Sequence, residues 1–199
     1  MPKTLYLENE KNDKTVASIT TTSTDSDILI DTMCCKEINN DLLKDEIIEF
    51  KLENFKLEKV LKYNYLNSNR FSPLASPTLQ AFFNKYAPND VQFIPCTIIT
   101  KDNKKVTDYA MINILTEIDG YDEEHTEYEY GNSPKTGKPY VCGINKIKYL
   151  NDAMGEHLIG RDKFTHSHIL FSEKFRDLLK QEKIKLKDYN YYLPEEWYS

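Results

Sequence analysis

The sequence predicts an α+β fold with a mixed or mainly antiparallel sheet and short helices capped by serine. Short apolar runs of strand length alternate loosely with amphipathic helical patterns along the 199 residues. Two apolar segments joined by the polar turn 101–105 predict an antiparallel hairpin. A helix–strand unit occurs twice, about a hundred residues apart, which we interpret as an internal duplication. Chance similarity is the alternative, because a helix followed by a strand is a common arrangement.

The first third of the chain predicts few regular elements. Residues 4–8 alternate as an opening strand does, and residues 10–27 are rich in threonine and serine, as loops are. The apolar run 27–35 predicts a buried strand. An asparagine near residue 40 can cap a short helix, whereas residues 50–61 fit either a strand or a helix.

Each copy of the repeated unit begins with a helix-capping serine. Ser76 and Ser172 can each accept a hydrogen bond from an amide of the first helical turn, which stabilises a helix by about 1 kcal/mol. Pro77 suits the first helical position, because an amide there has no partner within the helix. The predicted helices span residues 76–86 and 172–183. An apolar stripe on the first helix recurs in part on the second: Leu79, Phe82, Phe83 and Tyr86, then Phe175, Leu178 and Leu179.

Strands follow both predicted helices. Residues 91–100 and 106–118 form the predicted hairpin, and the second segment is apolar on both alternating faces, as a central strand would be. Residues 144–150 and 189–193 predict two further strands. Residues 151–163 carry glycines and charges, which predict irregular structure.

Composition predicts a well-solvated protein with a sizeable core. The chain is 40% hydrophobic and 29% charged, with a mean hydropathy of -0.62. Every apolar run is too short for a membrane span, and no secretory h-region follows Met1. We therefore expect a cytoplasmic protein with no membrane partner, folded as one domain or as two small halves that share a core.

The charge balance favours a protein partner. A net charge of -6 argues against a broad grip on nucleic acid, which needs a basic surface, and steers the chain toward a basic partner. The 14 tyrosines provide large contact areas with polar tips, as interfaces do. Spare tyrosines and edge strands could also support a homodimer, so both a monomer and a homodimer fit the sequence.

The four cysteines indicate neither a metal site nor a redox site. None forms a Cys-x-x-Cys motif, and only Cys34 and Cys35 are close in sequence. We expect reduced, buried thiols that pack in the core.

An acidic, tyrosine-rich stretch at 119–130 is the candidate partner-binding surface. Its carboxylates would speed encounter with a basic cleft of a partner protein, and desolvated tyrosines would slow release. A solvated loop or strand edge would have the same composition, and lysines elsewhere could instead face an acidic partner. The candidate residues are Asp119, Tyr121, Asp122, Glu123, Glu124, Glu127, Tyr128, Glu129 and Tyr130.

A His-x-His pair is the alternative site. On a strand, His166 and His168 would point to the same face and could bind zinc with a third ligand such as His157, His125 or Asp162. Two polar residues on the solvated face of a strand explain the same pattern, and this is the interpretation we favour. The sequence therefore predicts no metal and no cofactor, with a small metal-dependent hydrolase as the alternative function.

Four segments carry a resemblance to a known family. They are 73–76 at the first helix, 89–98 around the following strand, 108–115 with its Tyr-x-x-x-Asn pattern, and 169–175 at the second helix. In these segments the chain resembles the immunity proteins of bacterial polymorphic-toxin systems, a family first described from a myxobacterial immunity protein.

The resemblance implies a non-enzymatic protein that binds a cognate toxin and blocks it without a cofactor. It covers residues 63–199, whereas residues 1–62 resemble no family. We expect the two parts to pack together as one domain. A generic protein-interaction module unconnected with toxins is a further alternative.

Overall fold

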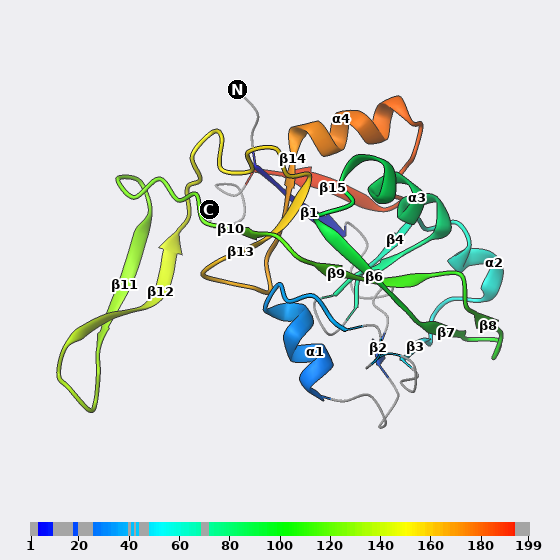
Figure 1. The fold of residues 1–199 in the computed structure, drawn as a ribbon, viewed down its shortest axis with the longest axis horizontal. Helices are drawn as coiled ribbons and strands as arrows, with labels where there is room; N and C mark the ends of the chain where they lie inside the picture. The colour runs from blue at the N-terminus through cyan, green and yellow to red at the C-terminus, as the bar shows by residue number, and fades with distance from the viewer. Residues whose placement is uncertain are drawn as a thin grey trace.

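The computed structural model describes residues 4–9, 18–19, 26–39, 41, 43, 48–68 and 72–193. They form an α+β fold with mixed and antiparallel sheets, as predicted (Figure 1). No helix in these residues is long and apolar enough to cross a membrane. The helices of this part of the chain are α1 (Ser26–Met33), α2 (Leu57–Val60), α3 (Pro77–Tyr86) and α4 (Glu173–Gln181).

The strands of this part of the chain belong to four sheets. In spatial order, the first sheet contains β10 (Glu117–Ile118), β13 (Ile159–Asp162), β14 (Ile169–Ser172), β1 (Thr4–Asn9) and β15 (Tyr189–Tyr192). The second sheet, also given in spatial order, contains β4 (Tyr65–Leu66), β5 (Leu74–Ala75), β9 (Ala110–Ile114) and β6 (Val91–Pro95). The third contains β2 (Ser18–Ile19), β3 (Glu49–Leu52), β7 (Thr97–Thr100) and β8 (Lys105–Val106), and the fourth pairs β11 (Glu127–Asn132) with β12 (Pro139–Lys146).

The two copies of the helix–strand unit share one topology. In the first copy, β5 and β6 are joined through α3 and flank β9, which is antiparallel to both. In the second copy, β14 and β15 are joined through α4 and flank β1 in the same way. The next strand outward is also equivalent, since β4 is antiparallel to β5 and β13 is antiparallel to β14. The middle strand follows its unit in the first copy and precedes it in the second.

Both predicted caps are present. Ser76 Oγ accepts a hydrogen bond from the Leu79 amide at 3.4 Å, and Ser172 Oγ accepts one from the Phe175 amide at 3.2 Å. Pro77 occupies the first helical position of α3. These local signals set where each helix begins, and the apolar stripe of each helix faces the core.

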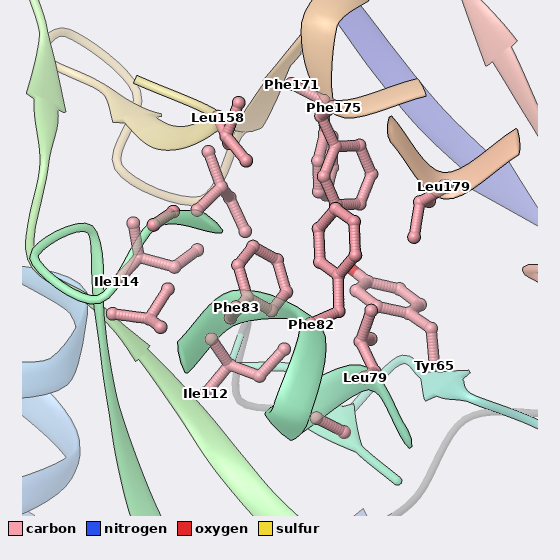
Figure 2. Close-up of a cluster of buried hydrophobic side chains, with 14 of the residues drawn as sticks. Tyr65, Leu79, Phe82, Phe83, Ile112, Ile114, Leu158, Phe171, Phe175 and Leu179 are labelled. Carbon is pink, nitrogen blue, oxygen red and sulfur yellow. The ribbon is translucent and has the colours of Figure 1, made fainter. Parts of the chain in front are cut away.

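The aromatic residues of the two helices pack against one another. The rings of Phe83 and Phe175 stack with their centroids 5.6 Å apart, and Phe82 meets Phe175 edge to face at 5.6 Å. Figure 2 shows these rings pointing toward one another, with Phe171 beside them. All four side chains are buried, so the two units share one core cluster.

The structure corrects the prediction for residues 27–35. They form helix α1 and its end instead of a strand, because an apolar run this short does not distinguish a buried strand from a buried helix. The chain turns at Cys35, whose φ is 56°, and the Lys36 amide donates to the Asp31 carbonyl at 3.2 Å. A residue in the left-handed conformation just after the last turn is a common helix ending.

The predicted hairpin is divided between two sheets. Residues 91–100 form β6 and β7, and the break follows Pro95, which has no amide proton to donate to a ladder. β9 is buried along its whole length, as predicted for a central strand. Residues 50–61 contain both alternatives, a strand and then a short helix, whereas the helix expected near residue 40 lies mostly outside the described residues.

Residues 151–163 are the clearest error of sequence reasoning about strands. Their last four residues before Lys163 form β13 instead of irregular structure. Two charged residues of this strand, Arg161 and Asp162, are fully buried. The Arg161 guanidinium donates to the His166 carbonyl at 2.7 Å and to Ser72 Oγ at 3.2 Å, which compensates part of its desolvation.

Candidate partner-binding surface

A two-stranded hairpin projects from the body of the molecule and carries the second half of the acidic stretch. We call residues 127–146, which include β11 and β12, the arm. Figure 1 shows it extending away from the other sheets. Its exposed tyrosines are Tyr130 and Tyr140, with 66% and 50% of their surface accessible. A two-stranded hairpin is only marginally stable in water, so the arm depends on its attachment to the body.

The base of the arm is fixed by a buried carboxylate. Tyr121 and Tyr149 pair as an isolated bridge on either side of the arm, and their rings stack 5.2 Å apart. Both hydroxyls donate to Asp162 Oδ2, and the Thr165 amide donates to Asp162 Oδ1 at 2.5 Å. Burial, together with the bond to Asp162, raises the pKa of Tyr121 well above its ordinary value, so its hydroxyl stays a donor at neutral pH. Tyr121 is therefore an anchor at the base of the arm and not a surface residue.

Several of the predicted acidic residues are paired within the chain. Asp119 binds Lys163, and Asp122 contacts His125 at 2.9 Å. The bond to His125 lowers the pKa of the Asp122 carboxyl, so it remains charged. Other contacts join Glu123 to the Tyr128 hydroxyl at 2.9 Å and Glu127 to Lys146 at 3.6 Å. Glu124 and Glu129 are exposed.

An aromatic row connects the buried base of the arm to its exposed face. Phe164 lies 6.3 Å from Tyr121 and 6.2 Å from Tyr128, and Tyr128 in turn lies 6.4 Å from Tyr130, all between ring centroids. Sequence reasoning missed Phe164 and Tyr140. Tyr140 pairs with Gly131 across the hairpin, a register that the alternation of β12 could have indicated. Phe164 comes from a distant turn and has no signal in the sequence.

The histidines are dispersed and do not form one site. His166 contacts Glu117 at 2.9 Å, and His157 contacts Asp90 at 2.7 Å. His166 and His168 lie in the turn before β14, so the expectation that they share a strand face is wrong. Across the described ranges, no group of three or more His, Cys, Asp or Glu side chains could hold a metal ion.

The cysteines are less buried than expected. Cys96 is buried, but Cys34 and Cys142 are exposed and Cys35 is half-buried. Cys34 and Cys35 lie at the end of a helix, and Cys142 lies on the arm, where little packs against it. Burial raises the pKa of Cys35 to about 11 and that of Cys96 to about 12, which keeps both thiols protonated and unreactive.

The comparison with known families decides the classification of this fold. The model of the Immunity protein family (Imm11) matches residues 46–191, most of the chain. The chain belongs to the Imm11 family. No curated protein matches it.

The Imm11 match is longer at its start than the resemblance found in the sequence. It begins at residue 46, upstream of residue 63, and so takes in β3 and α2. It also spans the arm and both helix–strand units. The arm is therefore part of the region that the Imm11 family model matches.

Proposed function

We propose that this Imm11 protein is a cytoplasmic, non-catalytic immunity protein that binds a cognate bacterial toxin and blocks it without a cofactor. The observation that carries the proposal is the match to an immunity family over residues 46–191. His157 and His166, which the alternative hydrolase site would bring together, contact two different carboxylates, those of Asp90 and Glu117.

The arm is the proposed contact with the toxin. Its projection would let it enter a concave active or substrate-binding site, where it would occlude the substrate. Exposed tyrosines gain most when an interface desolvates them, and the carboxylates of Glu124 and Glu129 would favour a toxin with a basic cleft. Toxin binding would also stabilise an arm that has few contacts of its own.

We further propose that residues 1–62 and 63–199 fold as one domain. Two pairings support this. β1 lies between β14 and β15, and β3 pairs in parallel with β7.

Removing the exposed rings of the arm is expected to abolish toxin binding. In the double variant Tyr130→Ser and Tyr140→Ser, the affinity should fall at least about a hundredfold, because aromatic residues of this kind dominate interface energetics. The melting temperature should stay within about 2 °C, since surface substitutions rarely alter stability. Binding would be measured by titration calorimetry with the purified toxin.

A control variant removes two apolar side chains that are similarly exposed but lie outside the arm. Ile30 and Leu61 are 55% and 57% exposed and lie outside the arm, so Ile30→Ser with Leu61→Ser should leave the affinity unchanged. Equal losses in both double variants would exclude the arm as the specific contact.

Charge reversal tests whether the toxin surface is basic. Replacing Asp122, Glu123 and Glu124 by lysine should slow association at low salt by at least about tenfold, because the carboxylates steer encounter. The same reversal at Glu53, Glu58 and Asp108, three exposed carboxylates outside the stretch, is the control. An unchanged association rate in the first variant, measured by stopped flow, would remove this stretch from the interface.

A further inference from the structure

A basic groove lies at the end of α4 and is separate from the arm. Its volume is about 590 Å³, and it is formed by α4, the loop that leads to β15, and the segment after α2. Figure 1 places the end of α4 on the opposite side of the molecule from β11 and β12. Six of its lining residues are cations, in a chain whose net charge is -6: Lys62, Arg176, Lys180, Lys183, Lys185 and Lys187.

Most of these cations have no acidic neighbour in the described residues. Arg176 contacts Glu173 and Asp177, each at 3.3 Å, and Lys180 contacts Asp177 at 3.7 Å. In the part of the chain that the structure describes, the other four lysines have no carboxylate oxygen within 4.0 Å of Nζ. The acidic residue of the loop, Asp188, accepts a hydrogen bond from the Tyr63 hydroxyl at 2.5 Å. The groove thus presents positive charge that the surrounding residues only partly neutralise.

The floor of the groove is apolar. Leu179 and Tyr189 are buried beneath it, whereas Ile184, Leu186 and Tyr191 are half-buried and still expose part of their surface. An apolar floor with a cationic rim is complementary to a segment that combines carboxylates with aliphatic side chains.

One lysine of the rim occupies a position that glycine would fill more favourably. Helix α4 ends in a Schellman arrangement, in which the Ile184 amide donates to the Leu179 carbonyl at 2.9 Å and the Lys183 amide donates to the Lys180 carbonyl at 3.1 Å. Lys183 therefore has a φ of 57°, a conformation that is unfavourable for residues other than glycine. This lysine adds its charge to the rim of the groove although its backbone conformation is unfavourable for it.

We propose that this groove binds an acidic peptide segment with aliphatic side chains, presented by a partner protein. Nucleic acid fits less well for two reasons. The net charge of the chain repels a polyanion that extends beyond the groove, and the two lining tyrosines are buried or half-buried, so they offer no open ring face for bases to stack on. The groove would be a second binding site, separate from the proposed toxin contact, because the arm lies on the other side of the molecule. Peptide binding to the groove can be measured without a toxin.

The test is binding of a labelled peptide of alternating glutamate and leucine to the full chain, followed by fluorescence anisotropy. We expect saturable binding that weakens at least about tenfold when salt rises from about 0.05 M to about 0.5 M. Peptides of alternating lysine and leucine, or glutamate and serine, should bind at least about tenfold more weakly. Absence of binding, or tighter binding of a single-stranded oligonucleotide, would overturn the proposal.

Two variants locate the binding to the groove. Lys62→Glu with Lys185→Glu should weaken peptide binding at least about tenfold, whereas Lys101→Glu with Lys104→Glu, an equal charge change on an exposed turn, should not. Lys183→Gly should weaken binding about threefold while the melting temperature rises, a combination that unfolding cannot produce. Equal effects of the two double variants on peptide binding would contradict the proposal. Salt-dependent self-association of the original chain that the Lys62 and Lys185 changes abolish would also contradict it, because the groove would then bind a second copy of this chain.

The outcome is independent of the immunity account. The peptide assay contains no toxin, so a failure to bind peptide leaves the arm proposal intact. Conversely, loss of toxin binding in the arm variant leaves the groove unaffected.

Discussion

Replacing Phe175 by alanine is expected to lower the free energy of unfolding by about 4 kcal/mol. The side chain is fully buried and lies at the contact between the two helix–strand units. Its ring meets Phe82, Phe83 and Phe171 with centroid distances of 4.9 to 5.6 Å. Truncation would remove apolar surface from the core and leave a cavity that three rigid rings cannot fill by rotation.

The measurement is urea denaturation followed by circular dichroism. Phe164→Ala is the matched control, because the same residue type is 49% exposed there and should lose at most about 1 kcal/mol. A loss below about 2 kcal/mol for Phe175→Ala would show that the packing of the two units contributes little to stability.

Replacing Asp162 by alanine is expected to lower the free energy of unfolding by about 3 kcal/mol and to release the arm. Three donors would lose their acceptor in the interior: the hydroxyls of Tyr121 and Tyr149 and the amide of Thr165. The two tyrosines are the points where the chain leaves and re-enters the body around the arm. Without Asp162, their stacked pair would no longer be held against β13.

Limited proteolysis separates this local effect from global unfolding. In Asp162→Ala, trypsin should cleave at Lys146 and Lys148 faster than in the original chain, at a urea concentration where both proteins remain folded by circular dichroism. Asp119→Ala is the control, since its ion pair with Lys163 is exposed and screened by solvent, so its loss should leave stability and cleavage nearly unchanged. Unchanged cleavage and stability in Asp162→Ala would show that the arm is held by other contacts.

Local signals allowed the helices of the repeated units to be predicted. A serine before an apolar stripe sets the start of α3 and of α4, because capping and amphipathicity act within a few residues. The burial of the entire β9 strand also follows from its composition. The topology that the two units share is visible only in three dimensions, where β9 and β1 occupy equivalent places although their positions in the chain differ.

The errors arise where distant residues determine the structure. Asp162 is buried, and the hydroxyls of tyrosines 41 and 13 residues away offset the cost by donating to it, which a charge pattern does not show. Tyr121 was included in the predicted partner-binding surface because its bond to Asp162 also cannot be read from the sequence. In the structure it anchors the base of the arm. The basic groove is lined by lysines from two segments about 120 residues apart, and such a combination cannot be read from the sequence. The sequence predicted only the acidic stretch as a binding surface.

Co-expression with the product of the adjacent upstream gene tests the central claim most directly. Growth would be followed with the original chain, with the Tyr130 and Tyr140 double variant, and with the Ile30 and Leu61 control, and each pair would be co-purified. The account predicts that the original chain and the control restore growth and form a stable complex, whereas the arm variant does neither. Restored growth without a complex would contradict it, because that result would point to an enzyme that removes the product or modification made by the toxin.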